Sequence, residues 1–146
     1  MVVHSEAESP SLLGVGFYLE DFPLGRRFRT LGRTVTEPDL VNFIGVTGMT
    51  EVLFTNLEYQ QKESVIAGRV VPAALVFSFA EAQVMQATLQ TTGMAFLGMD
   101  FQVKGPTVVG DTIHVEVEVT ESRRSASRPG TGLVRTRNHI INQRGE

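Results

Sequence analysis

Apolar residues dominate one stretch of the chain, from Gly68 to Leu89. The only charged residue between Arg69 and Asp100 is Glu81, and the first half of the stretch, 70–80, is apolar on every side apart from Ser78. A helix of this kind has to be covered by other elements. Its unbroken apolar part is shorter than the roughly 20 residues that cross a bilayer. We therefore expect a central helix packed against a sheet.

The start of this helix has an unusual pattern. Pro72 suits the first helical position, because its ring fixes φ and its missing N–H would have no helical partner. Val71 has no side-chain oxygen, so the next free amides, those of Ala73 and Ala74, lack a predicted cap. Free amides at the positive end of a helix dipole can stabilise an oxyanion. Ordinary solvation by water is the alternative interpretation.

Shorter elements are predicted on both sides of the central helix. Thr36, with the carboxylate of Asp39 three residues later, is typical of a helix start, and Gly48 is a natural end. After a loop over 49–55, Asn56 is expected to cap a second short helix. Strands are expected at about 26–35, 94–103, 111–121 and 133–142, with a bend at 105–106 and a loop over 122–131.

The clearest strand signal lies in the last third of the chain. Ile113, Val115, Val117 and Val119 alternate with polar residues, which predicts a half-buried antiparallel strand. Three basic residues of the following strand share one face and are expected to lie opposite three polar residues of this strand. They are Arg135, Arg137 and His139, opposite Glu116, Glu118 and His114.

Composition narrows the class of protein. The chain has 146 residues and is expected to form one domain over 15–146, after a loose tail over 1–14. Its net charge of −3 argues against a general nucleic-acid binder. It contains no cysteine, which excludes disulfides and thiolate chemistry, and its three histidines are too scattered for a metal motif. Since the N-terminus has no apolar secretory signal, we expect a cytoplasmic protein.

Several groups of residues share their order and spacing with one family. They are Gly32–Asp39 with Val41-Asn42-Phe43, Val46-Thr47-Gly48, Gly68-Arg69-Val70 and Val108–Ile113. From about Tyr18 onward the chain resembles the MaoC-like hydratases and dehydratases of the hotdog fold, relatives of (R)-specific enoyl-CoA hydratases. The resemblance implies an α+β domain whose antiparallel sheet wraps one long helix. It also implies a homodimer, or a higher oligomer of dimers, that holds an acyl-CoA thioester between subunits and needs no other cofactor.

The chain departs from the family at the catalytic positions. The family loop Gly-Asp-x-Asn-Pro-x-His matches the run from Gly48 to Phe54, where Met49 replaces the Asp, Glu51 the Asn and Phe54 the His. Neither Met nor Phe titrates, so the usual base and acid for hydration are missing. The family's His-Gly pair at the start of the helix matches Pro72-Ala73, and Ala73 keeps the amide that would polarise the thioester carbonyl.

Other side chains offer substitutes for the missing groups. Glu51, near apolar Met49, Val52 and Phe54, is a candidate general base, and a solvated surface glutamate is its alternative interpretation. Glu81 resembles the helix carboxylate of some hotdog thioesterases, although a helix face that reaches solvent or a dimer interface also explains it. The arginines of the predicted 122–131 loop are candidate contacts for coenzyme A phosphates, or are solvated. They are Arg123, Arg124 and Arg128.

Three hypotheses about function follow. The first is a MaoC-like hydratase or dehydratase family protein that binds an acyl thioester. The second is a catalytically silent subunit, paired with a paralogous hotdog subunit that supplies the Asp and His. The third is an acyl-CoA thioesterase that uses Glu51 or Glu81. The pattern does not define the acyl chain, nor whether Glu146 is the natural C-terminus.

Overall fold

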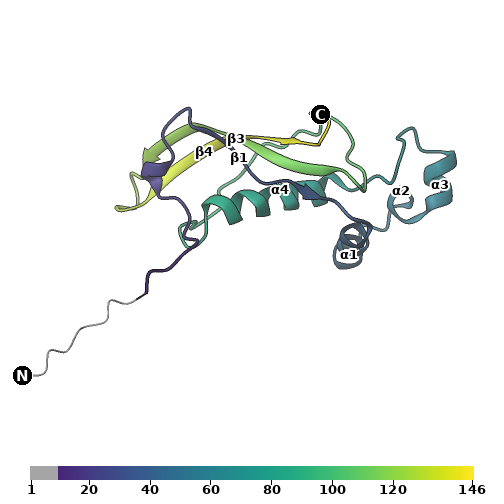
Figure 1. Ribbon diagram of the computed structural model, residues 1–146, viewed down its shortest axis with the longest axis horizontal. Coiled ribbons are helices and arrows are strands. Elements are labelled where there is room, and N and C mark those ends of the chain that lie inside the picture. The colour runs from purple at the N-terminus through teal and green to yellow at the C-terminus, as the bar shows by residue number, and fades with distance from the viewer. Residues whose placement is uncertain (1–9) are drawn as a thin grey trace, which may run out of the picture.

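The structure, a computed structural model, describes residues 10–146 and places a sheet over one long helix (Figure 1). Residues 1–9 of the predicted tail lie outside the described residues. In chain order the elements are the 3-10 helix η1 (Leu19–Asp21), β1 (Arg27–Arg29), β2 (Arg33–Thr34), α1 (Glu37–Thr47), α2 (Val52–Thr55), α3 (Leu57–Lys62), α4 (Ala73–Thr88), β3 (Thr112–Arg124) and β4 (Gly132–Ile141).

β3 is the strand around which the sheet is built. β1, β2 and β4 each pair with it in antiparallel orientation. The predicted alternation is confirmed, because Ile113, Val115, Val117 and Val119 are buried while the polar residues between them are half-buried on the other face. The buried side chains form the core against α4.

The β3–β4 hairpin confirms most of the predicted cross-strand pairing. Glu116 lies opposite His139, and Glu118 lies opposite Arg137. A register shift between Val119 and Glu121 places Arg135 opposite Glu121, which was not among its predicted partners. His114 lies opposite Ile141, so its predicted pairing with a basic residue is wrong. Pairing continues beyond this bulge, so β3 extends to Arg124 and the predicted loop over 122–131 begins too early.

Helix α4 is buried on one face only. Leu75, Val76 and Ala80 are buried and pack toward the sheet, in clusters that include Ile113 and Val115. On the uncovered face Met85 is 49% exposed. The prediction of a helix against a sheet is confirmed, whereas complete coverage of this helix is not seen within one chain.

The N-terminal half follows the predicted capping signals. The amide and hydroxyl of Thr36 both donate to the carboxylate of Asp39, and α1 ends at Gly48 in the left-handed conformation. The side chain of Asn56 caps α3 by accepting from the amide of Tyr59. The single strand expected over 26–35 is divided into β1 and β2, and the loop expected over 49–55 contains α2.

The strand predicted over 94–103 is not formed. A strand needs a hydrogen-bonding neighbour, and within residues 10–146 no backbone hydrogen bond joins this segment to another strand. Its large apolar side chains are therefore between 43% and 79% exposed. They are Met94, Phe96, Leu97, Met99, Phe101 and Val103. The bend expected nearby is present at Gly105.

The helices that the structure describes include none with the length and apolar character needed to cross a membrane. The cytoplasmic location stays a prediction.

Candidate active site

The first turn of α4 leaves two backbone donors free. Pro72 is the N-cap rather than the first helical residue, because its ψ of 137° is extended and its carbonyl accepts the first helical bonds, from Leu75 and Val76. Within residues 10–146 neither Ala73 nor Ala74 donates its amide to any acceptor. Both alanines are half-buried. The structure thus presents two amides at the positive end of a helix 16 residues long.

The segment before α4 is held in place from two directions. The amide of Val71 donates to the carbonyl of Thr107 at 3.0 Å, and the amide of Val109 donates to the carbonyl of Arg69 at 2.8 Å. These bonds tie the helix start to the chain just ahead of β3. They fix the direction in which the amides of Ala73 and Ala74 point.

An ion pair that sequence reasoning missed supports the same segment. The guanidinium of Arg69 lies 3.0 Å from the carboxylate of Glu37, in the first turn of α1. The Arg69 side chain is 16% exposed, and its Nη1 is buried without a partner among the described residues. Arg69 belongs to the Gly68-Arg69-Val70 motif, but nothing in the pattern of the chain indicated its partner.

The positions that replace the family's catalytic residues lie in and beside α2. Met49 follows the end of α1 and is 38% exposed, while Phe54 is half-buried within α2. Glu51 is exposed, and its carboxylate accepts from the amide of Leu53 at 3.0 Å, which makes it the N-cap of α2. Figure 1 shows α2 beside α3 at one end of the molecule, beyond the start of α4. No hydrogen bond among the described residues joins Glu51 to Ala73 or Ala74.

Glu81 lies farther along α4. It is half-buried and has no ion-pair partner within residues 10–146. It follows Ala74 by two turns on nearly the same face, so the helical rise places it about 10 Å from that residue along the axis. Within residues 10–146, no hydrogen bond joins the Glu81 carboxylate to the amide of Ala73 or Ala74.

The candidate phosphate-binding arginines lie at the other end of α4. Arg123 pairs with Glu121 at 2.7 Å, and Arg124 lies 3.8 Å from Glu20 in η1. The end of α4 contacts the chain just ahead of η1, through the bond from the Phe17 amide to the Thr88 carbonyl. Figure 1 shows the β3–β4 hairpin tip, which carries Arg128, at this end. The structure does not bring these arginines and Ala73 together in one chain.

The described residues also show no obvious metal site. His114 and His139 lie on β3 and β4, and His4 lies outside the described residues. Within 10–146 no group of three histidine, aspartate or glutamate side chains is placed to hold a metal ion.

The chain matches one family model and is similar to several solved structures. The family model described as "FAS1-like, dehydratase domain region" matches residues 23–146. A MaoC-like dehydratase from Rhodospirillum rubrum is similar, with 26% identity, a TM-score of 0.76, and coverage of 90% of this chain and 89% of that one. A monoamine oxidase regulatory protein from Archaeoglobus fulgius is 29% identical, with a TM-score of 0.76 and coverage of 90% and 87%.

A third structure identifies the fold. It is a conserved hypothetical protein from Mycobacterium tuberculosis described as having a double hotdog fold. It is 21% identical, with a TM-score of 0.71, and the match covers 90% of this chain and 41% of that one. No curated protein sequence matches the chain. The predicted hotdog fold, with one long helix against an antiparallel sheet, is confirmed.

Proposed function

This chain belongs to the FAS1-like family, dehydratase domain region, and from that premise we propose that it binds an acyl-CoA thioester at the start of α4. The observation that carries the proposal is the pair of free, half-buried amides of Ala73 and Ala74. A thioester carbonyl that accepts from these amides gains a hydrogen bond and the favourable field of the helix dipole.

We propose that a second subunit supplies the acid and the base for hydration. Addition of water to an enoyl thioester needs one group to take a proton from water and one to deliver a proton to the α-carbon. Met49 and Phe54 have no titratable group, and Glu51 is exposed and engaged as a helix cap. We propose that this protein is a silent thioester-binding subunit, and that a second hotdog subunit with an Asp and a His supplies the chemistry.

Hydrolysis of the thioester by Glu51 or Glu81 has less support. Glu51 has no contact with the start of α4, and Glu81 lies about 10 Å along the helix from Ala74. Neither carboxylate contacts the free amides at the first turn, where the thioester carbonyl is proposed to bind.

A dimer is the assembly we propose for this protein. The segment 94–103 exposes a run of large apolar side chains, and the uncovered face of α4 exposes Met85. The rings of Phe77 on α4 and Phe101 lie 5.6 Å apart, so these two apolar surfaces meet. A contiguous apolar surface of this kind is typical of an interface between subunits. A second copy placed over it would also enclose the ligand beside α4.

The proposal is tested by incubating the purified protein with crotonyl-CoA and measuring both binding and hydration. Binding to the native state alone raises the melting temperature, so crotonyl-CoA should raise it more than free coenzyme A does. Hydration should not exceed that of a heat-inactivated sample. Absence of any shift with short or long acyl-CoA would contradict thioester binding. Enzyme-like hydration that is lost in Glu51→Gln would contradict the silent role. It would not contradict the proposal that the protein binds a thioester.

A further inference from the structure

The outer face of the sheet, turned away from α4, carries charged side chains in three columns. We call it the basic face. β1 contributes Arg27 and Arg29, and the inward Phe28 between them packs on the core. β4 contributes a second basic column and β3 a column of glutamates between the two. The full set is Arg27, Arg29, Arg123, Arg135, Arg137 and His139 with Glu116, Glu118 and Glu121.

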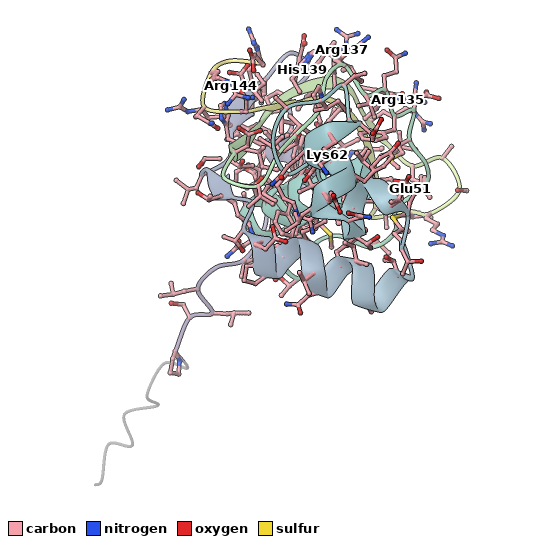
Figure 2. All side chains as sticks on the ribbon, turned by 90° about the vertical axis from the view of Figure 1, so that its right-hand side faces the viewer. Glu51, Lys62, Arg135, Arg137, His139 and Arg144 are labelled. Carbon is pink, nitrogen blue, oxygen red and sulfur yellow. The ribbon has the colours of Figure 1, made fainter. Side chains whose placement is uncertain are left out.

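The pairing register explains this arrangement. Glu116 lies opposite Arg29 in β1 and opposite His139 in β4. Glu118 likewise has a basic residue on each side. Figure 2 shows Arg135, Arg137 and His139 together on the side of the molecule opposite α1. Glu116 and Glu118 are therefore flanked by basic side chains on both sides, and these basic side chains form the rims of the face.

The basic face has more positive than negative charge, although the chain as a whole is acidic. Five arginines stand against three glutamates, a balance of +2, whereas the chain carries −3. Residues 10–146 carry a net charge of −1, so the described residues outside the basic face carry −3. Charge segregated in this way attracts a partner of opposite sign.

Most of these arginines are only loosely engaged by internal pairing, and Arg123, which lies 2.7 Å from Glu121, is the exception. The Arg27–Glu116 and Arg137–Glu118 pairs are both 3.8 Å long, with arginine side chains 72% and 65% exposed. Exposed pairs of this length contribute little to stability. Within residues 10–146 Arg29 and His139 have no ion-pair partner. An open hollow of about 280 Å³ lies beside Arg27 and Arg29.

The chemistry of arginine suits a carboxylate-bearing ligand. The chain has 13 basic residues other than histidine, and only Lys62 and Lys104 are lysines. All five cations of the basic face are arginines. The planar guanidinium binds a carboxylate with two parallel hydrogen bonds, and arginine is enriched at protein interfaces whereas lysine is depleted.

Glu116 and Glu118 on β3 make binding unfavourable for some classes of acidic partner. A rigid row of phosphates, as in duplex DNA or an anionic membrane, would place negative charge directly over Glu116 and Glu118. The flexible carboxylate side chains of a protein can instead reach the β1 and β4 arginines, and the glutamates then weaken this binding without preventing it. We propose that the basic face binds the carboxylate-rich surface of a second protein. This surface is separate from the proposed thioester site.

Binding of poly-L-glutamate, a carboxylate polymer, tests this proposal by fluorescence anisotropy at low and at physiological salt. The double variant R135Q/R137Q should bind about tenfold more weakly than the wild type, and added salt should reduce the difference. The matched control K62Q/K104Q loses the same net charge away from the basic face and should bind within twofold of the wild type.

A second pair of variants tests the face without removing arginines. E116Q/E118Q removes the repulsive column and should strengthen binding, whereas E58Q/E63Q, with the same change in net charge on and beside α3, should not. Equal effects of the matched pairs would overturn the proposal, because net charge alone would then explain binding. Absence of poly-L-glutamate binding at low salt, or tighter binding of duplex DNA or of phosphatidylglycerol vesicles, would also overturn it.

Discussion

Asp111 has its carboxylate buried and fully engaged. Its side chain is 1% exposed and accepts from the amide of Val108 at 3.0 Å, from Gln143 at 2.9 Å and from Arg144 at 3.0 Å. Gln143 in turn accepts from the amide of Thr112 at 2.8 Å. This network joins the start of β3 to the turn after β4. Because β3 carries the buried core, the network fixes one end of the strand on which the fold depends.

Replacing Asp111 with asparagine should lower the free energy of unfolding at neutral pH by about 3 kcal/mol, since the amide group cannot accept from all three donors and carries no charge to attract Arg144. Urea unfolding measures this change. The exposed Asp100→Asn is the control and should change stability by less than about 0.5 kcal/mol. Equal stability of the Asp111 variant and the wild type would contradict the assigned role.

The same variant should alter the pH dependence of stability. Burial raises the pKa of Asp111, but the Val108 amide, Gln143 and Arg144 outweigh it and hold the pKa below the usual value. A lowered folded-state pKa contributes stability above the unfolded pKa of about 3.9, and that contribution is lost as pH falls through the folded value. The difference between wild type and Asp111→Asn should therefore shrink toward low pH. A constant difference would contradict this.

Single residues also show what the sequence could not reveal. The resemblance indicated Ala73, and the structure shows its amide free. The Arg69–Glu37 pair and the Asp111 network join residues about 30 positions apart, and no periodic pattern encodes such contacts. The exposure of Glu51 and its use as a cap depend on α2, a helix of four residues that is too short to produce a periodic signal.

Among the elements, those with strong local signals were predicted correctly. α1 has its cap and its glycine end, and β3 has a regular alternation of buried and polar residues. The bulge in β3 was not predictable, because it changes pairing with β4 without changing the alternation before it. The segment 94–103 has the composition of a strand but depends on a neighbour that local sequence cannot supply.

The exposed segment 94–103 allows a direct test of the proposed dimer. If it forms the proposed dimer interface, Leu97→Asp places a charge in an apolar contact and should convert a dimer into a monomer. Leu97 is 79% exposed in one chain, and Val65→Asp is the matched control at a fully exposed valine away from the segment. Light scattering after gel filtration gives the mass. A wild-type monomer, or a dimer that survives Leu97→Asp, would contradict the proposed interface.

At the scale of the whole molecule, the two proposed binding regions lie on different sides of the sheet. The first turn of α4, beside the chain that enters β3, carries the free amides, and its last turn lies near η1 and the β3–β4 hairpin. The basic face lies on the opposite side of the sheet from α4. A ligand at the first turn and a protein partner on the basic face would therefore occupy opposite sides of the sheet.

The measurement that tests thioester binding most directly is calorimetric titration of crotonyl-CoA into Ala73→Pro and Ala73→Gly. Proline removes the amide proton but is tolerated at the first helical position, and glycine keeps the proton. Ala73→Pro should bind about fivefold more weakly than Ala73→Gly, since one hydrogen bond contributes about 1 kcal/mol. Equal affinity of the two variants, with circular dichroism showing α4 intact in both, would contradict the proposal that the start of α4 holds the thioester.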